Sequence, residues 1–305
     1  MEKALAYTVV AGSTACPNDC GICISKMTPS HGLSSLESVV DWDLFDKATN
    51  VAVSYGAKYF LITSKGEASL FPAQVSEYLH KVEGKPFIRR ELQTEGSTIA
   101  HGGRMYDEFL KVWKNNGLDL VAISIYHYDD VKNHEVFKSK DAPYSLESLI
   151  KKIQHHGMNV RLSCVMLKNY VDNIDEVAKL IDFSKKNDVF QLTLRTADRP
   201  SVSLNEEVAK YVDDNKTPAE FTDRVIEYLD DKGTLCDVLP HGALVYEVNG
   251  QNVALTTGLS SKFKKSASAT FDKTYASNDT VRQLVFLPPS MLTTSWENIY
   301  GGRIL

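Results

Sequence analysis

The chain has 305 residues, of which 43% are apolar and 24% are charged, and this composition excludes a disordered or fibrous protein. Its formal net charge of −5 argues against an extended nucleic-acid-binding surface, which would need a basic excess. The odd number of cysteines, five, does not suggest a disulfide framework, and no apolar run approaches the roughly 18 residues of a membrane span, so we expect a cytoplasmic protein without membrane contact.

Short β-branched runs alternate with longer segments of helical period from residue 4 to about residue 200. This alternation is typical of βα units around a parallel sheet, and five crossovers in one direction build either a barrel or an open doubly wound sheet. The predicted strands are Leu5–Gly12, Tyr59–Thr63, Phe87–Gln93, Leu120–Tyr126, Val160–Leu167 and Val189–Arg195. The predicted helices lie near 36–54, 73–83, 104–115, 145–156 and 173–187.

The βα alternation stops after Pro200. A helical segment near 204–232 precedes two alternating runs that flank Asn249-Gly250, which is a strong hairpin signal. Residues 258–279 are rich in Ser, Lys, Thr and Ala and indicate a mobile loop, which the run Arg282-Gln-Leu-Val-Phe-Leu-Pro-Pro follows. We therefore expect a barrel-like domain over residues 1–200 and a small β-rich extension over 201–305 that closes the barrel.

Polar side chains occupy one face of four predicted strands. A closed eight-stranded barrel fills its interior with branched aliphatic residues, so this pattern favours an inner face that holds a polar ligand. The alternative is that some of these residues cap strand ends in solvent. The residues concerned are Arg89, Glu91, Gln93, Ser124, Tyr126, Arg161, Ser163, Gln191, Thr193 and Arg195.

Three cysteines, Cys16, Cys20 and Cys23, lie within eight residues directly after the first predicted strand. Clustered thiolates hold zinc or an iron–sulfur cluster, and three ligands leave one coordination position for a group that is not protein. A zinc site would need a fourth ligand, for which His31 is a candidate, although no second pair of ligands follows. The remaining cysteines, Cys164 and Cys236, are isolated, so we expect a single cluster.

The spacing Cys16-x3-Cys20-x2-Cys23 after the first strand resembles that of the radical S-adenosylmethionine (radical SAM) enzymes. Within residues 5–200, Lys65-Gly66-Glu67 resembles the family's Gly-Gly-Glu segment, with a lysine in place of the first glycine. The segment Gln93-Thr94-Glu95-Gly96 resembles the Thr-Asn-Gly turn of the molybdenum-cofactor and peptide-modifying branches. Many family members place an aromatic residue before the last cysteine, where this chain has Gly21-Ile22.

The resemblance implies a partial (β/α)6 TIM-like barrel and two cofactors, a [4Fe–4S] cluster and S-adenosylmethionine (SAM). It implies that the three cysteines bind the cluster and that an electron donor such as flavodoxin or ferredoxin reduces it. The cluster would cleave SAM to a 5′-deoxyadenosyl radical, which takes hydrogen from the substrate. The residues that the resemblance assigns to SAM binding are Gly66, Glu67, Thr94, Ser124, Arg161, Ser163 and Gln191.

Three further residues are candidates for catalysis. Tyr126 and His127 follow the fourth strand, where they would gate the site or relay a proton, although such a sequence is also ordinary loop surface. Arg195 would suit an anionic group of the substrate. For Arg161, a salt bridge with Glu91 is the alternative to binding a carboxylate.

The substrate stays open at this stage. A single predicted cluster in a compact chain favours a small-molecule or nucleotide-like substrate. A peptide or protein substrate is the alternative, and a non-catalytic zinc or iron–sulfur protein is the alternative from another class.

Overall fold

The computed structural model describes residues 3–239, 242–256, 280–288, 291–294, 296 and 303–305. The predicted mobile loop at 258–279 lies outside these residues. The strands are β1 (Lys3–Val10), β2 (Tyr59–Thr63), β3 (Arg89–Thr94), β4 (Leu120–Ile125), β5 (Asn159–Met166), β6 (Gln191–Thr196), β7 (Gly233–Val238), β8 (Leu244–Val248), β9 (Gln251–Thr256), β10 (Thr280–Leu287) and β11 (Met291–Thr293).

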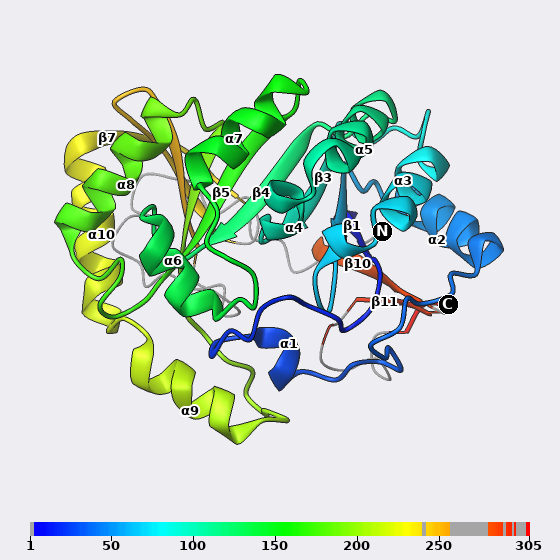
Figure 1. Cartoon of the computed structure of the whole chain (residues 1–305), viewed down its shortest axis with the longest axis horizontal. Coiled ribbons are helices and arrows are strands. Elements are labelled where there is room, and N and C mark those ends of the chain that lie inside the picture. The colour runs from blue at the N-terminus through cyan, green and yellow to red at the C-terminus, as the bar shows by residue number, and fades with distance from the viewer. Residues whose placement is uncertain (1–2, 240–241, 257–279, 289–290, 295, 297–302) are drawn as a thin grey trace.

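Helices follow each of the first six strands (Figure 1). They are α1 (Ile24–Met27), α2 (Trp42–Ser54), α3 (Pro72–Lys81), α4 (Ser97–His101), α5 (Gly103–Asn115), α6 (Asp130–Phe137), α7 (Leu146–His155), α8 (Ile174–Lys186), α9 (Glu206–Asn215) and α10 (Ala219–Lys232), with a short 3-10 turn, η1, at Ala68–Leu70. Among the described residues, no helix is long and apolar enough to cross a membrane.

The sheet has the strand order β11-β10-β1-β2-β3-β4-β5-β6-β9-β8-β7, and β1 to β6 are all parallel. It is not closed, because β11 and β7 form its two edges. The fold is the expected partial (β/α)6 barrel, in which the carboxyl ends of the six parallel strands meet at one rim. Residues that follow those strands are therefore brought together.

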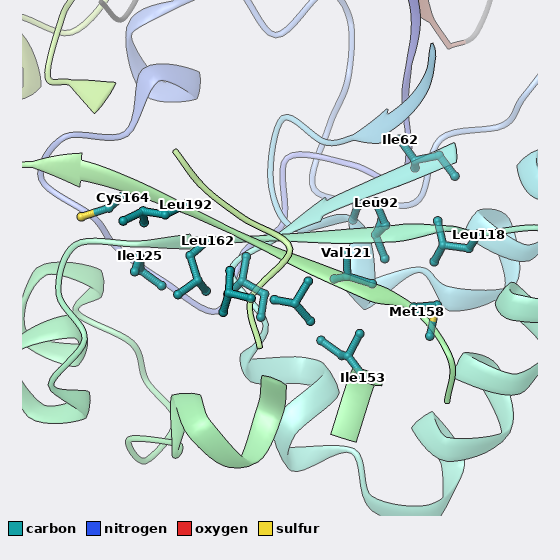
Figure 2. Packing of buried hydrophobic residues seen from close by; sticks show 14 of the residues in the cluster. Ile62, Leu92, Leu118, Val121, Ile125, Ile153, Met158, Leu162, Cys164 and Leu192 are labelled. Carbon is teal, nitrogen blue, oxygen red and sulfur yellow. The ribbon is translucent and has the colours of Figure 1, made fainter. Parts of the chain in front are cut away.

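Strand parity separates the two faces of the sheet. Ile62, Leu92, Val121, Leu162 and Leu192 are fully buried between the sheet and its outer helices, and Figure 2 shows several of these side chains packed with Ile153 of α7. On β5 and β6, the residues between these buried positions point to the other face of the sheet and are only partly buried. These two strands therefore have an apolar outer face and a polar concave face.

The chain after residue 200 extends the sheet on both sides. The hairpin of β8 and β9 turns at Asn249 and Gly250, both with positive φ, as the Asn-Gly pair predicts. Strand β9 pairs parallel with β6, and β10 pairs parallel with β1. The predicted helical segment near 204–232 is two helices, because Pro218 prevents a continuous helix. A domain division at residue 200 stays a prediction.

Candidate active site

The three cysteines lie in the loop between β1 and α1, at the carboxyl rim of the sheet. All three are free thiols, and Cys23 is the N-cap residue of α1. Helix α9 supports the loop, because Met27 of α1 packs into an apolar cluster with Val208 and Val212. The strand order and this packing fix the loop where ligands of parallel barrels bind.

The segment after β2 is hydrogen-bonded to the cysteine loop. The backbone N–H of Glu67 donates to the carbonyl of Ala15 at 2.9 Å, and the hydroxyl of Ser64 donates to the carbonyl of Ser13 at 3.1 Å. A Cβ atom on Gly66 would lie 2.0 Å from the Ala15 carbonyl oxygen. The two loops approach this closely only because residue 66 is glycine.

The Glu67 carboxylate is buried and accepts hydrogen bonds from neutral donors. It accepts from the N–H of Ser69 at 2.8 Å, the hydroxyl of Thr94 at 2.6 Å and the N–H of Glu95 at 2.9 Å. Within the described residues it has no basic partner. The structure thus brings Glu67 and Thr94 together around an anion whose charge is available to a cationic ligand group.

Glu95 is a second buried carboxylate, for which the sequence predicted no role. Burial and the charge of Glu67 raise its pKa to about 7. Its position inside the Gln93–Gly96 turn was the available signal. Glu95 lines a cavity of about 10 Å³, which is about the space of one water molecule, with Asn18, Asp130 and Tyr144.

The thiols fit an iron–sulfur cluster better than a single zinc ion. Burial, with added repulsion from neighbouring acidic groups, raises the pKa of Cys16 and of Cys20 to about 12, so binding a metal must displace their protons. No three His, Cys, Asp or Glu residues in the described ranges are arranged to hold one metal ion. In a [4Fe–4S] cluster each thiolate binds a different iron, so the ligands need not converge on one point. His31, the candidate zinc ligand, hydrogen-bonds the Trp296 carbonyl at 2.8 Å.

The concave face holds several of the other predicted residues. Ser124 and Ser163 are register partners on β4 and β5. Arg161 forms an ion pair with Glu91, with Nη2 and Oε1 2.5 Å apart, which is the alternative role considered for this arginine. Gln191 donates to the Asn252 side chain at 2.6 Å. Arg161 and Gln191 are therefore engaged with other protein groups.

Arg195 lies half-buried on β6, on the same face as Gln191 and Thr193. Burial and the nearby charges of Arg282 and Arg161 lower its pKa to about 10, so it stays protonated at neutral pH. Among the described residues it forms no ion pair. This part of the concave face is positively charged.

Tyr126 and His127 point to different surroundings. Tyr126 packs in one apolar cluster with Cys20. His127 accepts from the N–H of Asp129 through Nδ1 at 2.9 Å, and its Nε2 lies 3.1 Å from the Glu176 carboxylate on α8. Both ring nitrogens of His127 are engaged away from the cysteine loop, whereas Tyr126 lies beside it.

Comparisons with known proteins agree with this geometry. The family model described as the radical SAM superfamily matches residues 10–184. No curated protein matches the chain. Among solved structures, Streptococcus suis SuiB bound to S-adenosylmethionine is 14% identical, with a TM-score of 0.61, and SuiB bound to precursor peptide SuiA is 14% identical, with a TM-score of 0.60.

A structure of anSMEcpe with bound AdoMet is 16% identical, with a TM-score of 0.51, and the match covers 75% of this chain and 59% of that chain. The SuiB matches cover 96% of this chain and 60% of SuiB. The chain thus spans about three fifths of the length of these proteins. At these identities the likeness shows the fold alone.

Proposed function

The chain belongs to the radical SAM superfamily, and we propose that it takes hydrogen from a small polar substrate held on the concave face of the sheet. Superfamily members are enzymes that use a [4Fe–4S] cluster and SAM and need a reductant. When bound, the reduced cluster supplies the electron that cleaves SAM to a 5′-deoxyadenosyl radical. The observation that carries the proposal is the loop of three free thiols at the carboxyl rim, hydrogen-bonded through Ala15 to the Glu67 segment.

Each group of residues has a proposed role. Cys16, Cys20 and Cys23 would hold the cluster, one iron each. Glu67, oriented by Thr94, would bind the ammonium group of SAM, because it is a buried carboxylate with no basic partner in the described part of the chain. Ser124 and Ser163 would contact SAM on the concave face.

Arg195 is the proposed contact for an anionic group of the substrate. A guanidinium binds a carboxylate or phosphate through two parallel hydrogen bonds, and its position on a sheltered face would hold the substrate away from water. Arg161 forms an ion pair with Glu91, whereas Arg195 forms no ion pair with an acidic residue of the described chain and feels the charge of Glu91 only from a distance.

Anaerobic reconstitution and product analysis test the function. We expect about four irons per chain and 5′-deoxyadenosine formed from SAM under dithionite, and the triple variant with all three loop cysteines changed to alanine is the control that should give neither. Bound zinc without SAM cleavage would refute the assignment.

The substrate class needs a separate measurement. Cells are grown in deuterated medium, and their extract is separated into a low-mass and a high-mass fraction. If the substrate is a small molecule, the low-mass fraction should supply the deuterium that the enzyme transfers into 5′-deoxyadenosine. Arg195→Ala should abolish this transfer while slow substrate-free SAM cleavage persists.

A peptide substrate is the second candidate. It is favoured by the likeness to SuiB, which is seen with its precursor peptide SuiA. Deuterium transfer from the high-mass fraction alone would select it.

A further inference from the structure

The turn between Cys20 and Cys23 packs against an aromatic ring of α9. A Cβ atom on Gly21 would lie 2.8 Å from Cε1 and 2.9 Å from Cδ1 and Cζ of Tyr211, which is closer than a real Cβ atom can approach. The φ angle of Gly21 lies outside the left-handed region, so its backbone would accept any residue. The ring of Tyr211, and not the shape of the turn, therefore requires a glycine at position 21.

Ile22, the other residue between these two cysteines, is held by apolar contacts. It packs against a cluster that includes Met27 of α1 with Val208 and Val212 of α9. It also packs against a second cluster that includes Phe137 of α6. The turn is thus anchored to both α9 and α6.

Helix α6 reaches the same ring and the same loop. Lys138, the C-cap residue of α6, places its ammonium 5.5 Å from the centroid of the Tyr211 ring, where a cation is attracted to the aromatic face. The backbone N–H of Asp19 in the cysteine loop donates to the carbonyl of Phe137 at 3.0 Å. Tyr211 therefore joins the cysteine loop, α6 and α9 at one point.

We propose that Tyr211 is a positioning residue that holds the turn between Cys20 and Cys23 in place before a cluster binds. The inference rests on the proposed function, which gives these thiols their purpose. A loop that is already ordered loses less conformational entropy when it binds its cofactor, so its affinity for the cluster is higher. Tyr211 acts through Gly21 and does not itself need to touch iron or SAM.

This residue comes from the part of the chain after residue 200. The family model matches residues 10–184, and Tyr211 lies beyond them on α9. The spacing of the three cysteines does not specify such a contact. The segment after residue 200 would thus take part in the cofactor site, in addition to extending the sheet.

Alkylation of the iron-free full-length protein tests the inference without any cofactor. The protein is treated with iodoacetamide, and mass spectrometry gives the labelling rate of each cysteine. Exposed Cys236 on β7 and buried Cys164 on β5 are internal references. We expect Tyr211→Ala to raise the rates of Cys20 and Cys23 roughly tenfold, because the loop opens more often once the ring is removed.

Two variants are matched controls. Tyr211→Phe keeps the ring and should show the wild-type labelling rates. Tyr228→Ala removes a partly buried ring of α10 that packs against the main core, so it should lower the melting temperature and leave the labelling of Cys20 and Cys23 unchanged. Unchanged rates in Tyr211→Ala, or an equal rise in Tyr211→Phe or Tyr228→Ala, would overturn the inference.

Gly21→Ala probes the same contact from the loop and covers the case in which Tyr211→Ala does not fold. The added methyl group must displace the ring or the turn, so the labelling rates should rise in this variant too. In the double variant with alanine at both positions the collision is absent, and the rates should be no higher than in Tyr211→Ala. Unchanged rates in Gly21→Ala, or effects that multiply in the double variant, would contradict the proposed contact.

A second readout uses the reconstituted protein. A strong iron chelator should remove iron faster from Tyr211→Ala than from the wild type or Tyr211→Phe, and equal rates in all three would count against the inference. Failure of the proposed function is distinguishable, because the wild type would then hold no iron–sulfur cluster or would not cleave SAM. The labelling of the iron-free protein would still show whether Tyr211 holds the turn.

Discussion

Gly66→Ala is expected to weaken cofactor binding through a backbone collision. The new Cβ atom would lie 2.0 Å from the carbonyl oxygen and 2.6 Å from the carbonyl carbon of Ala15, the residue before Cys16. Because backbone atoms cannot rotate away, either the cysteine loop or the Glu67 segment must move. The hydrogen bond between Glu67 and Ala15, 2.9 Å long, would be strained or lost.

The size of the effect follows from the cost of overpacking. Forcing atoms into a filled site costs about 1–3 kcal/mol, which corresponds to roughly 5- to 150-fold in an equilibrium constant. If the cofactor site bears this cost, the affinity for SAM should drop by a factor in this range. The amount of iron retained at limiting iron and sulfide should drop as well. Iron per chain and calorimetric SAM binding measure the two effects.

Gly84→Ala is the matched control. Gly84 has φ +72° and no atom within 4 Å of a new Cβ, so alanine there costs about 1–2 kcal/mol of backbone strain without a collision. We expect a lower melting temperature with normal iron content. Wild-type iron content and SAM affinity in Gly66→Ala would refute the reasoning that the two loops are coupled through residue 66.

Three further predictions concern the thiols, the concave ion pair and a buried histidine. Alanine at Cys16, Cys20 or Cys23 should each prevent assembly of a four-iron cluster, whereas Cys164→Ala should not, and iron and sulfide analysis decides this. Glu91→Gln should lower the free energy of unfolding by about 1–3 kcal/mol. This is less than the loss expected for a fully buried ion pair, because the Arg161 side chain is 22% exposed. An unchanged denaturation midpoint would contradict this expectation. Burial lowers the pKa of His127, so its contribution to stability is fully present above about pH 6.5 and is lost as pH falls toward the folded-state pKa. As pH falls below about 6.5, the melting temperature of His127→Gln should therefore decrease less than that of the wild type. Parallel pH profiles of the two proteins would contradict this expectation.

Local signals in the sequence predicted most of the barrel. Strand β2 occupies the predicted residues Tyr59–Thr63, and the Asn249-Gly250 turn forms the predicted hairpin. Helix α6 was missed although Asp129 caps it, accepting from the N–H groups of Val131 and Lys132. The cap was a readable signal, but the helix is too short to show a clear apolar stripe.

Contacts across the barrel could not be predicted in the same way. The pair of Arg161 and Glu91 joins β5 to β3 over β4, where Ala122 is the register partner of Arg161 and leaves space above it. This register across three strands decides whether Arg161 pairs with Glu91 or is free to bind a carboxylate of a ligand.

The pairing of β10 with β1 has a consequence for how the protein is made. Lys3 is the register partner of Thr280, so the strand that precedes the cysteine loop lacks one neighbour until residue 280 and those after it have been synthesised. Such a distant parallel pairing forms slowly, and an unpaired strand edge is prone to aggregate during that time. The folding of this edge therefore waits for the synthesis of β10, and β1, which leads into the cysteine loop, is paired on both sides only when β10 is added.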